Sequence, residues 1–96
     1  MNPDDILGRL RELKPLVSTR YKTGEIGLFG SFVRGEQGID SDVDLLVEFE
    51  EGADLFDLMG LALYLEEQLR RKVDVVPKRA LREELRESVL REIVPV

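Results

Sequence analysis

Two aspartates separated by one valine stand at the start of the most strand-like run of the chain. They are Asp42 and Asp44, in the segment DSDVDLLVEF. Residues two positions apart on a strand point to the same face, with their Cα atoms about 7 Å apart. Two carboxylates at this spacing raise each other's pKa unless a cation neutralises them. Mg²⁺ is the natural cation, because it prefers oxygen ligands next to phosphates.

A third aspartate, Asp74, lies among the valines of the segment VDVV. A charge inside a buried apolar run is costly, so Asp74 needs a compensating partner. If this run pairs beside the run that follows Asp42, the three carboxylates come together. They would then be able to hold two metal ions about 4 Å apart, as in two-metal phosphoryl-transfer sites.

A Gly-Ser pair, Gly30 and Ser31, directly follows another apolar run. A glycine there lets backbone N–H groups approach a phosphate, and the serine adds a hydroxyl donor. Arg34 follows three residues after Ser31, and its guanidinium can make paired hydrogen bonds to phosphate oxygens. Equally, Arg34 can form an ion pair with Asp40, Asp42 or the end of the sheet.

Each of these short motifs has a simpler interpretation when taken alone. A Gly-Ser pair is more often an ordinary turn, and DVD is more often a surface turn whose aspartates cap and bend the chain. Asp74 can lie at an exposed sheet edge. The combination of the motifs, at their distances along the chain, favours a metal-dependent phosphate site.

Strands and helices alternate along the chain. Apolar runs predict strands over residues 25–29, 43–49 and 72–77. The charged, glycine-rich loop between the first two strands is long for so small a domain, which is typical of a functional segment. The alternation predicts an α/β or α+β fold, and 96 residues predict a single domain over 1–96.

Helical spacing of apolar residues predicts three helices. The first begins near Asn2, and Pro15 indicates that it kinks or ends soon afterwards. The second covers residues 54–71 and is apolar nearly all round, which favours partners on two sides over simple burial within this domain. The third is an amphipathic helix over 80–94, with an apolar stripe of Leu81, Leu85, Val89, Leu90 and Ile93.

The composition restricts the chemistry. The chain has no histidine and no cysteine, so any catalysis must use carboxylates, hydroxyls, Lys, Arg and bound metal. Its net charge is -6, so the chain lacks the overall positive charge that is typical of a nucleic-acid-binding protein. No apolar run approaches the ~18 residues of a membrane span, and the N-terminus does not resemble a signal peptide. We therefore expect a cytoplasmic protein that binds neither membranes nor nucleic acids directly.

The motifs together form a set: GS, ten residues, DVD, and later VDVV. This set resembles the nucleotidyltransferase superfamily of DNA polymerase β. The segment GSFVRGEQGIDSDVDLLVEF, in a chain with little else, resembles the minimal nucleotidyltransferase (MNT) family, over about residues 24–96. The resemblance implies a small mixed sheet with helices packed on one face and the metal site on the open face.

The resemblance also implies roles for individual residues. Gly30 and Ser31 match the motif that holds the β- and γ-phosphates of the incoming nucleotide. Asp42 and Asp44 match the first two metal-binding carboxylates. Asp74 matches the third, which lies near the attacking hydroxyl and accepts its proton.

Arg34 matches a position that is often basic in the MNT family. Many members are the antitoxin of a module whose toxin is a HEPN-domain ribonuclease. The resemblance therefore implies a Mg²⁺-dependent enzyme that transfers AMP from ATP to a tyrosine hydroxyl of that toxin. The alternative is a non-catalytic antitoxin that neutralises its toxin by contact. The apolar second helix is suited to either the toxin or a second copy in a homodimer.

Overall fold

The apolar runs form one four-stranded mixed sheet in the computed structural model, which describes residues 2–96. Its strands are β1 (Thr23–Phe29), β2 (Val43–Phe49), β3 (Val73–Pro77) and β4 (Val94–Pro95). Their order across the sheet is β3-β2-β1-β4. Strand β1 is antiparallel to β2 and β4, whereas β2 and β3 are parallel. This architecture confirms the expected α/β fold with a small mixed sheet.

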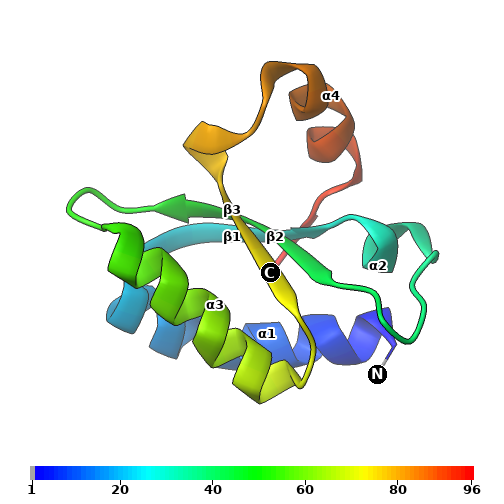
Figure 1. Ribbon diagram of the computed structural model, residues 1–96, viewed down its shortest axis with the longest axis horizontal. Helices are drawn as coiled ribbons and strands as arrows, with labels where there is room; N and C mark the ends of the chain where they lie inside the picture. The colour runs from blue at the N-terminus through cyan, green and yellow to red at the C-terminus, as the bar shows by residue number, and fades with distance from the viewer. Residues whose placement is uncertain (1) are drawn as a thin grey trace.

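Two long helices, α1 (Pro3–Tyr21) and α3 (Leu55–Leu69), lie together against one face of the sheet (Figure 1). Both begin with a reciprocal capping box, in which Asn2 and Asp54 accept from the backbone of the third helical residue. Both end at a residue in the left-handed conformation, Lys22 and Arg70. Local sequence therefore sets both ends of each helix.

The core lies between this helical layer and the sheet. Along β2, the side chains of Val43, Leu45 and Val47 are fully buried. They pack in one cluster with the apolar stripes of α1 and α3, which include Leu10 and Leu61. Because side chains alternate along a strand, Asp44 points to the opposite face of the sheet. The core thus fixes which face carries the carboxylates.

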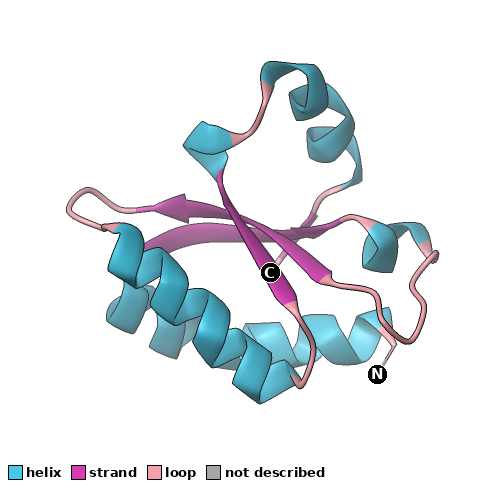
Figure 2. Ribbon diagram, in the orientation of Figure 1, coloured by secondary structure: helices cyan, strands magenta, loops and turns pink. Residues whose placement is uncertain are grey.

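Among residues 2–96, it is the C-terminal part of the chain that covers the opposite face. After β3 come a 3-10 turn, η1 (Lys78–Ala80), and helix α4 (Glu83–Glu92). Figures 1 and 2 show α4 standing above the sheet, on the side away from α1 and α3. Within α4, all of which the structure describes, Val89 is the only buried residue. This helix therefore rests on the sheet through a narrow contact.

Several predicted boundaries were wrong. Helix α1 continues through Pro15 to Tyr21, because Pro15 is exposed, so the carbonyl that it frees can face solvent, while Val17 beyond it is buried. The first strand starts two residues earlier than predicted, at Thr23. The loop after it contains an unpredicted short helix, α2 (Ser31–Arg34).

The predicted closing helix was also too long. It divides into η1, α4 and the two-residue strand β4, which pairs with β1. Its apolar stripe is only partly used, since Leu85 and Leu90 stay exposed. No helix among residues 2–96 combines the length and apolar character that crossing a bilayer requires.

Candidate active site

Strand pairing brings Asp44 and Asp74 together. In the parallel ladder of β2 and β3, Asp44 is the register partner of Asp74. On its other side, Asp44 pairs with Phe29, the last residue of β1. Gly30, the next residue along the chain, therefore lies directly beside the Asp44 carboxylate. Three segments that are distant in sequence converge on one point at the sheet.

The absence of a side chain at Gly30 is a requirement of this geometry. Gly30 has φ +83, and a Cβ atom there would lie 3.0 Å from Asp44 Cγ and closer still to its Oδ2. Positive φ is accessible to glycine at little cost. The Gly30 carbonyl accepts from the N–H groups of Val33 and Arg34, which closes the turn into α2. Glycine is thus the residue that lets the turn approach the carboxylate.

Asp74 is more exposed than the sequence suggested. Strand β3 is an edge strand, and Asp74 is exposed on it. The expectation that Asp74 is a charge buried in an apolar run was therefore wrong, and the sheet-edge alternative describes its position. Its proximity to Asp44 comes from strand register.

The surroundings of Asp44 disfavour the ionised form of its carboxyl. The pKa of its carboxyl is raised from 3.8 to about 6, first by burial and then by the negative charges of Asp74 and Asp42. Asp42 itself precedes β2 and is exposed. The site has an excess of negative charge, which is the environment that a divalent cation would neutralise.

The carboxylates do not form a closed metal cage. Among residues 2–96, no three acidic side chains are gathered closely enough to enclose an ion by themselves. Asp44 and Asp74 are adjacent, whereas Asp42 stands at the entrance of the strand. Such an open arrangement fits Mg²⁺, which usually takes one or two carboxylates and completes its ligands with substrate phosphates and water.

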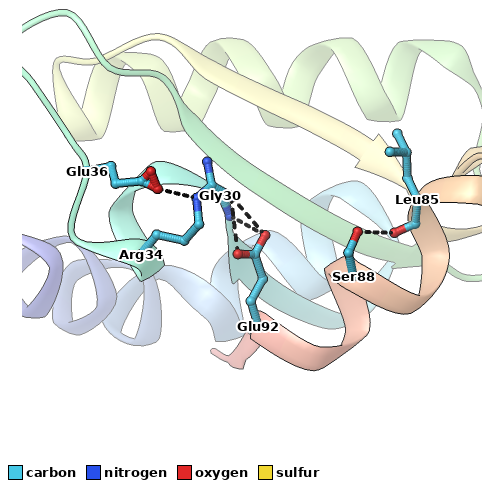
Figure 3. Close-up of polar contacts among 6 residues, drawn as sticks. All are labelled: Gly30, Arg34, Glu36, Leu85, Ser88 and Glu92. Atoms are coloured by element: carbon cyan, nitrogen blue, oxygen red, sulfur yellow. Dashed lines mark hydrogen bonds and ion pairs between the residues drawn. The ribbon is translucent and has the colours of Figure 1, made fainter.

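Arg34 is held by two glutamates (Figure 3). Its Nε donates to Glu36 at 2.8 Å, and its Nη1 donates to both carboxylate oxygens of Glu92 at 3.2 Å. These bonds, to Glu36 first and Glu92 second, raise the pKa of Arg34. The predicted ion-pair partners of Arg34, Asp40 and Asp42, were therefore wrong. Glu92 lies 58 residues further along the chain, where no local signal marks it.

A cleft of about 650 Å³ opens over these groups. Gly30, Arg34, Asp44 and Asp74 line it on the sheet side, and Glu92 lines it from α4. The remaining lining is largely apolar, with two polar residues from the C-terminal part of the chain, and consists of Phe29, Val76, Ala80, Leu81, Arg82, Leu85, Ser88 and Val89. Of the predicted site residues, Ser31 and Asp42 are not among the lining residues.

Arg71 anchors the loop that carries Asp42. Its guanidinium stacks 5.1 Å from the ring centre of Phe32. It also donates to the carbonyls of Ile39 at 3.1 Å and Ser41 at 3.4 Å. The turn before β3 thereby fixes both α2 and the end of the loop. No sequence pattern predicted a role for Arg71, because neither its partners nor the stacked ring lies near it in the chain.

Residues 10–96 match the family described as a nucleotidyltransferase domain. The chain is 44% identical over 93 residues to the protein adenylyltransferase MntA of Thermococcus cleftensis, which covers 97% of this chain and 94% of the relative.

Solved structures give the same picture. One described as a minimal nucleotidyltransferase has a TM-score of 0.87 at 43% identity and covers 100% of this chain and 97% of its own. Another is a complex of a tri-AMPylated Shewanella oneidensis HEPN toxin with its MNT antitoxin. It has a TM-score of 0.60 at 26% identity and covers 98% of this chain and 67% of the other. The chain belongs to the nucleotidyltransferase domain family, as one of its minimal members, and is a nucleotidyltransferase.

Proposed function

We propose that this protein is a Mg²⁺-dependent protein adenylyltransferase that transfers AMP from ATP to a tyrosine hydroxyl of a HEPN-domain toxin, and so acts as its antitoxin. The observation that carries the proposal is the convergence of Asp44, Asp74 and the Gly30 turn in one open cleft. The similarity to an MNT antitoxin complexed with a tri-AMPylated HEPN toxin supports the choice of acceptor.

The chain's own residues fit this reaction. Asp44 and Asp74, with Asp42 nearby, would hold Mg²⁺, which when bound neutralises phosphate charge and polarises the α-phosphate. Two such ions remain our prediction. The backbone N–H of Gly30, the Ser31 hydroxyl and the Arg34 guanidinium are the donors for the β- and γ-phosphates.

The transfer makes one bond and breaks one. The tyrosine oxygen bonds to the α-phosphorus, the bond from that phosphorus to the bridging oxygen of the β-phosphate breaks, and pyrophosphate leaves. Asp74, which is exposed at the edge of the cleft, accepts the proton of the attacking hydroxyl. Such a reaction needs positioning and charge neutralisation more than a protein nucleophile, so a chain without histidine or cysteine can perform it.

The direct test uses ATP labelled at the α-phosphate. The protein is incubated with this ATP, Mg²⁺ and a HEPN-domain protein from its own source organism, and label on the HEPN-domain protein is measured. We expect transfer of the α label and no transfer from ATP labelled at the γ-phosphate. Transfer of the γ label would identify a kinase, and absence of both labels would refute the proposal.

A second candidate is an antitoxin that neutralises its toxin by contact alone. It is favoured by α3, which exposes Leu55, Phe56, Met59 and Leu63 along one side. Exposed apolar stripes of this kind mark protein interfaces. The double variant Asp42→Asn with Asp44→Asn separates the two candidates. If this variant still neutralises the toxin in cells, contact is sufficient and catalysis is not the mechanism.

A further inference from the structure

Glu92 occupies a position that no local sequence pattern predicts. It is the last residue of α4, and its carboxylate reaches across the cleft to the turn after β1 (Figure 3). One oxygen accepts from the Gly30 backbone N–H at 3.3 Å. Both oxygens accept from Arg34 Nη1 at 3.2 Å. A single carboxylate thus binds two separate donors.

These two donors are the ones assigned to the phosphates of the nucleotide. A carboxylate can take the place of a phosphate at such donors, because both are anions that offer only acceptor oxygens. Glu92 therefore fills an anion position, and it does so in a site that already holds Asp44 and Asp74. A third negative charge at this point opposes the entry of a triphosphate, both by occupying donors and by repulsion.

The surroundings of Glu92 allow its carboxylate to leave. Helix α4 touches the rest of the molecule mainly through Val89, and the Glu92 side chain keeps 22% of its surface exposed. The backbone just beyond it is fixed, because Val94 pairs with Leu28 in the sheet. Displacement therefore needs a side-chain rotation, helped by movement of a loosely packed helix, and leaves the sheet intact.

We propose that Glu92 is an intramolecular competitor for the nucleotide: its carboxylate occupies the phosphate donors Gly30 and Arg34 in the free protein and must be displaced when a nucleoside triphosphate binds. The inference rests on the proposed nucleotide site. In the free protein, Glu92 gives both donors a hydrogen-bond partner before the substrate arrives. The association constant for the nucleotide is then reduced to its intrinsic value multiplied by the fraction of molecules in which the carboxylate has left the donors.

The test measures the dissociation constant of AMP-PNP with Mg²⁺ by calorimetry, and then that of inorganic tripolyphosphate with Mg²⁺. The variants are Glu92→Gln, which keeps the size and removes the charge, and Glu92→Ala, which removes both. The matched control is Glu87→Gln. Glu87 is a glutamate on the exposed side of the same helix that pairs with Arg91 and touches neither donor. Thermal melts verify that each variant folds. If one Glu92 variant does not fold, the other is sufficient for the binding test.

We expect both Glu92 variants to bind both ligands about three- to tenfold more tightly, with Glu87→Gln unchanged. Unchanged or weaker binding in the Glu92 variants, with normal binding by the unsubstituted protein, overturns the competitor role and leaves the proposed function standing. An equal gain in Glu87→Gln reduces the effect to net charge and also overturns it. If no protein binds AMP-PNP, the proposed function fails as well.

Discussion

At the scale of single residues, Asp44 is the electrostatic centre of the molecule. It is half-buried, next to Asp74 in the ladder and beneath the Gly30 turn. Its carboxyl holds a proton more tightly in the folded protein, with a pKa of about 6 against an ordinary 3.8. Between these values the folded state binds more protons than the unfolded state, so ionised Asp44 lowers stability as the pH rises through this window.

We therefore predict that Asp44→Asn stabilises the metal-free protein above pH 6. The full shift would be worth about 3 kcal/mol, but solvent screens a carboxyl that is partly exposed, so we expect about 1 kcal/mol. Denaturant titrations at pH 8 and pH 3 measure the difference, which should vanish at pH 3. Asp40→Asn, an exposed loop aspartate, is the control and should change little. A destabilised Asp44→Asn at pH 8 would contradict this account.

A second residue-scale prediction concerns Gly30. Gly30→Ala places a methyl group against the Asp44 carboxylate and forces alanine to positive φ. Gly35→Ala is the control for positive φ alone, since Gly35 has φ +74 and open space where a Cβ would lie. Its ψ of 21 is left-handed helical, whereas Gly30 has ψ -153, which costs alanine more, so the extra loss in Gly30→Ala combines backbone strain with the contact to Asp44. We expect about 1 kcal/mol of destabilisation in the control from backbone strain alone. Gly30→Ala should lose about 1–3 kcal/mol more and bind AMP-PNP at least tenfold more weakly.

Urea unfolding and calorimetry on both glycine variants provide the measurement. Equal losses in Gly30→Ala and Gly35→Ala would mean that the close approach of the turn to Asp44 does not matter.

At the scale of elements, helix α3 has two apolar sides, of which one packs in the core and the other is exposed. Leu65 is 1% exposed and faces the core, whereas Leu63 is 65% exposed and Phe56 82% exposed. The inner side stabilises the fold, and the outer side does not contribute to the free protein's core. The two sides can therefore be separated by mutation.

We predict that Leu65→Ala costs about 2–5 kcal/mol of unfolding free energy, because it leaves a cavity in the core. Leu63→Ala makes the same chemical change two residues away and should cost less than about 0.5 kcal/mol. Urea titration compares the two. A large loss in Leu63→Ala would show that the outer side of α3 is already covered, for example by a second copy of the chain.

Sequence patterns predicted the elements whose periodicity is local. The run after Asp42 and the run around Asp74 identified β2 and β3. Their adjacency was a condition of the predicted metal site, and the parallel pairing of the two strands confirms it. What was missed depends on contacts distant in sequence. Strand β4 is too short to show a period, and α4 has few apolar contacts to fix its position. Glu92 looks like any solvated glutamate of an amphipathic helix, and only the fold brings it to Gly30.

At the scale of the whole molecule, the sheet separates stability from chemistry. One face packs on α1 and α3 and holds the core, while the other carries the carboxylates under a narrowly attached α4 (Figure 1). The chain has a net charge of -6, and three of its carboxylates line the cleft, those of Asp44, Asp74 and Glu92. A free nucleoside triphosphate is an anion, so its entry depends on a cation.

We predict that AMP-PNP binding requires a divalent metal. Calorimetry in Mg²⁺ and in EDTA should differ by at least tenfold in dissociation constant, because repulsion between carboxylates and phosphates is no longer screened. Asp44→Asn should reduce this metal dependence. Equal affinity in EDTA and Mg²⁺ would mean that the carboxylates do not hold a metal with the nucleotide.

The most direct test of the central claim is the intact mass of the partner toxin after production in the same cell as this protein. The account predicts a toxin heavier by one or more AMP groups on tyrosine when the protein is unsubstituted. It predicts an unmodified toxin when the protein carries Asp44→Asn. A toxin that is neutralised by the unsubstituted protein yet keeps its unmodified mass would contradict adenylyl transfer as the mechanism.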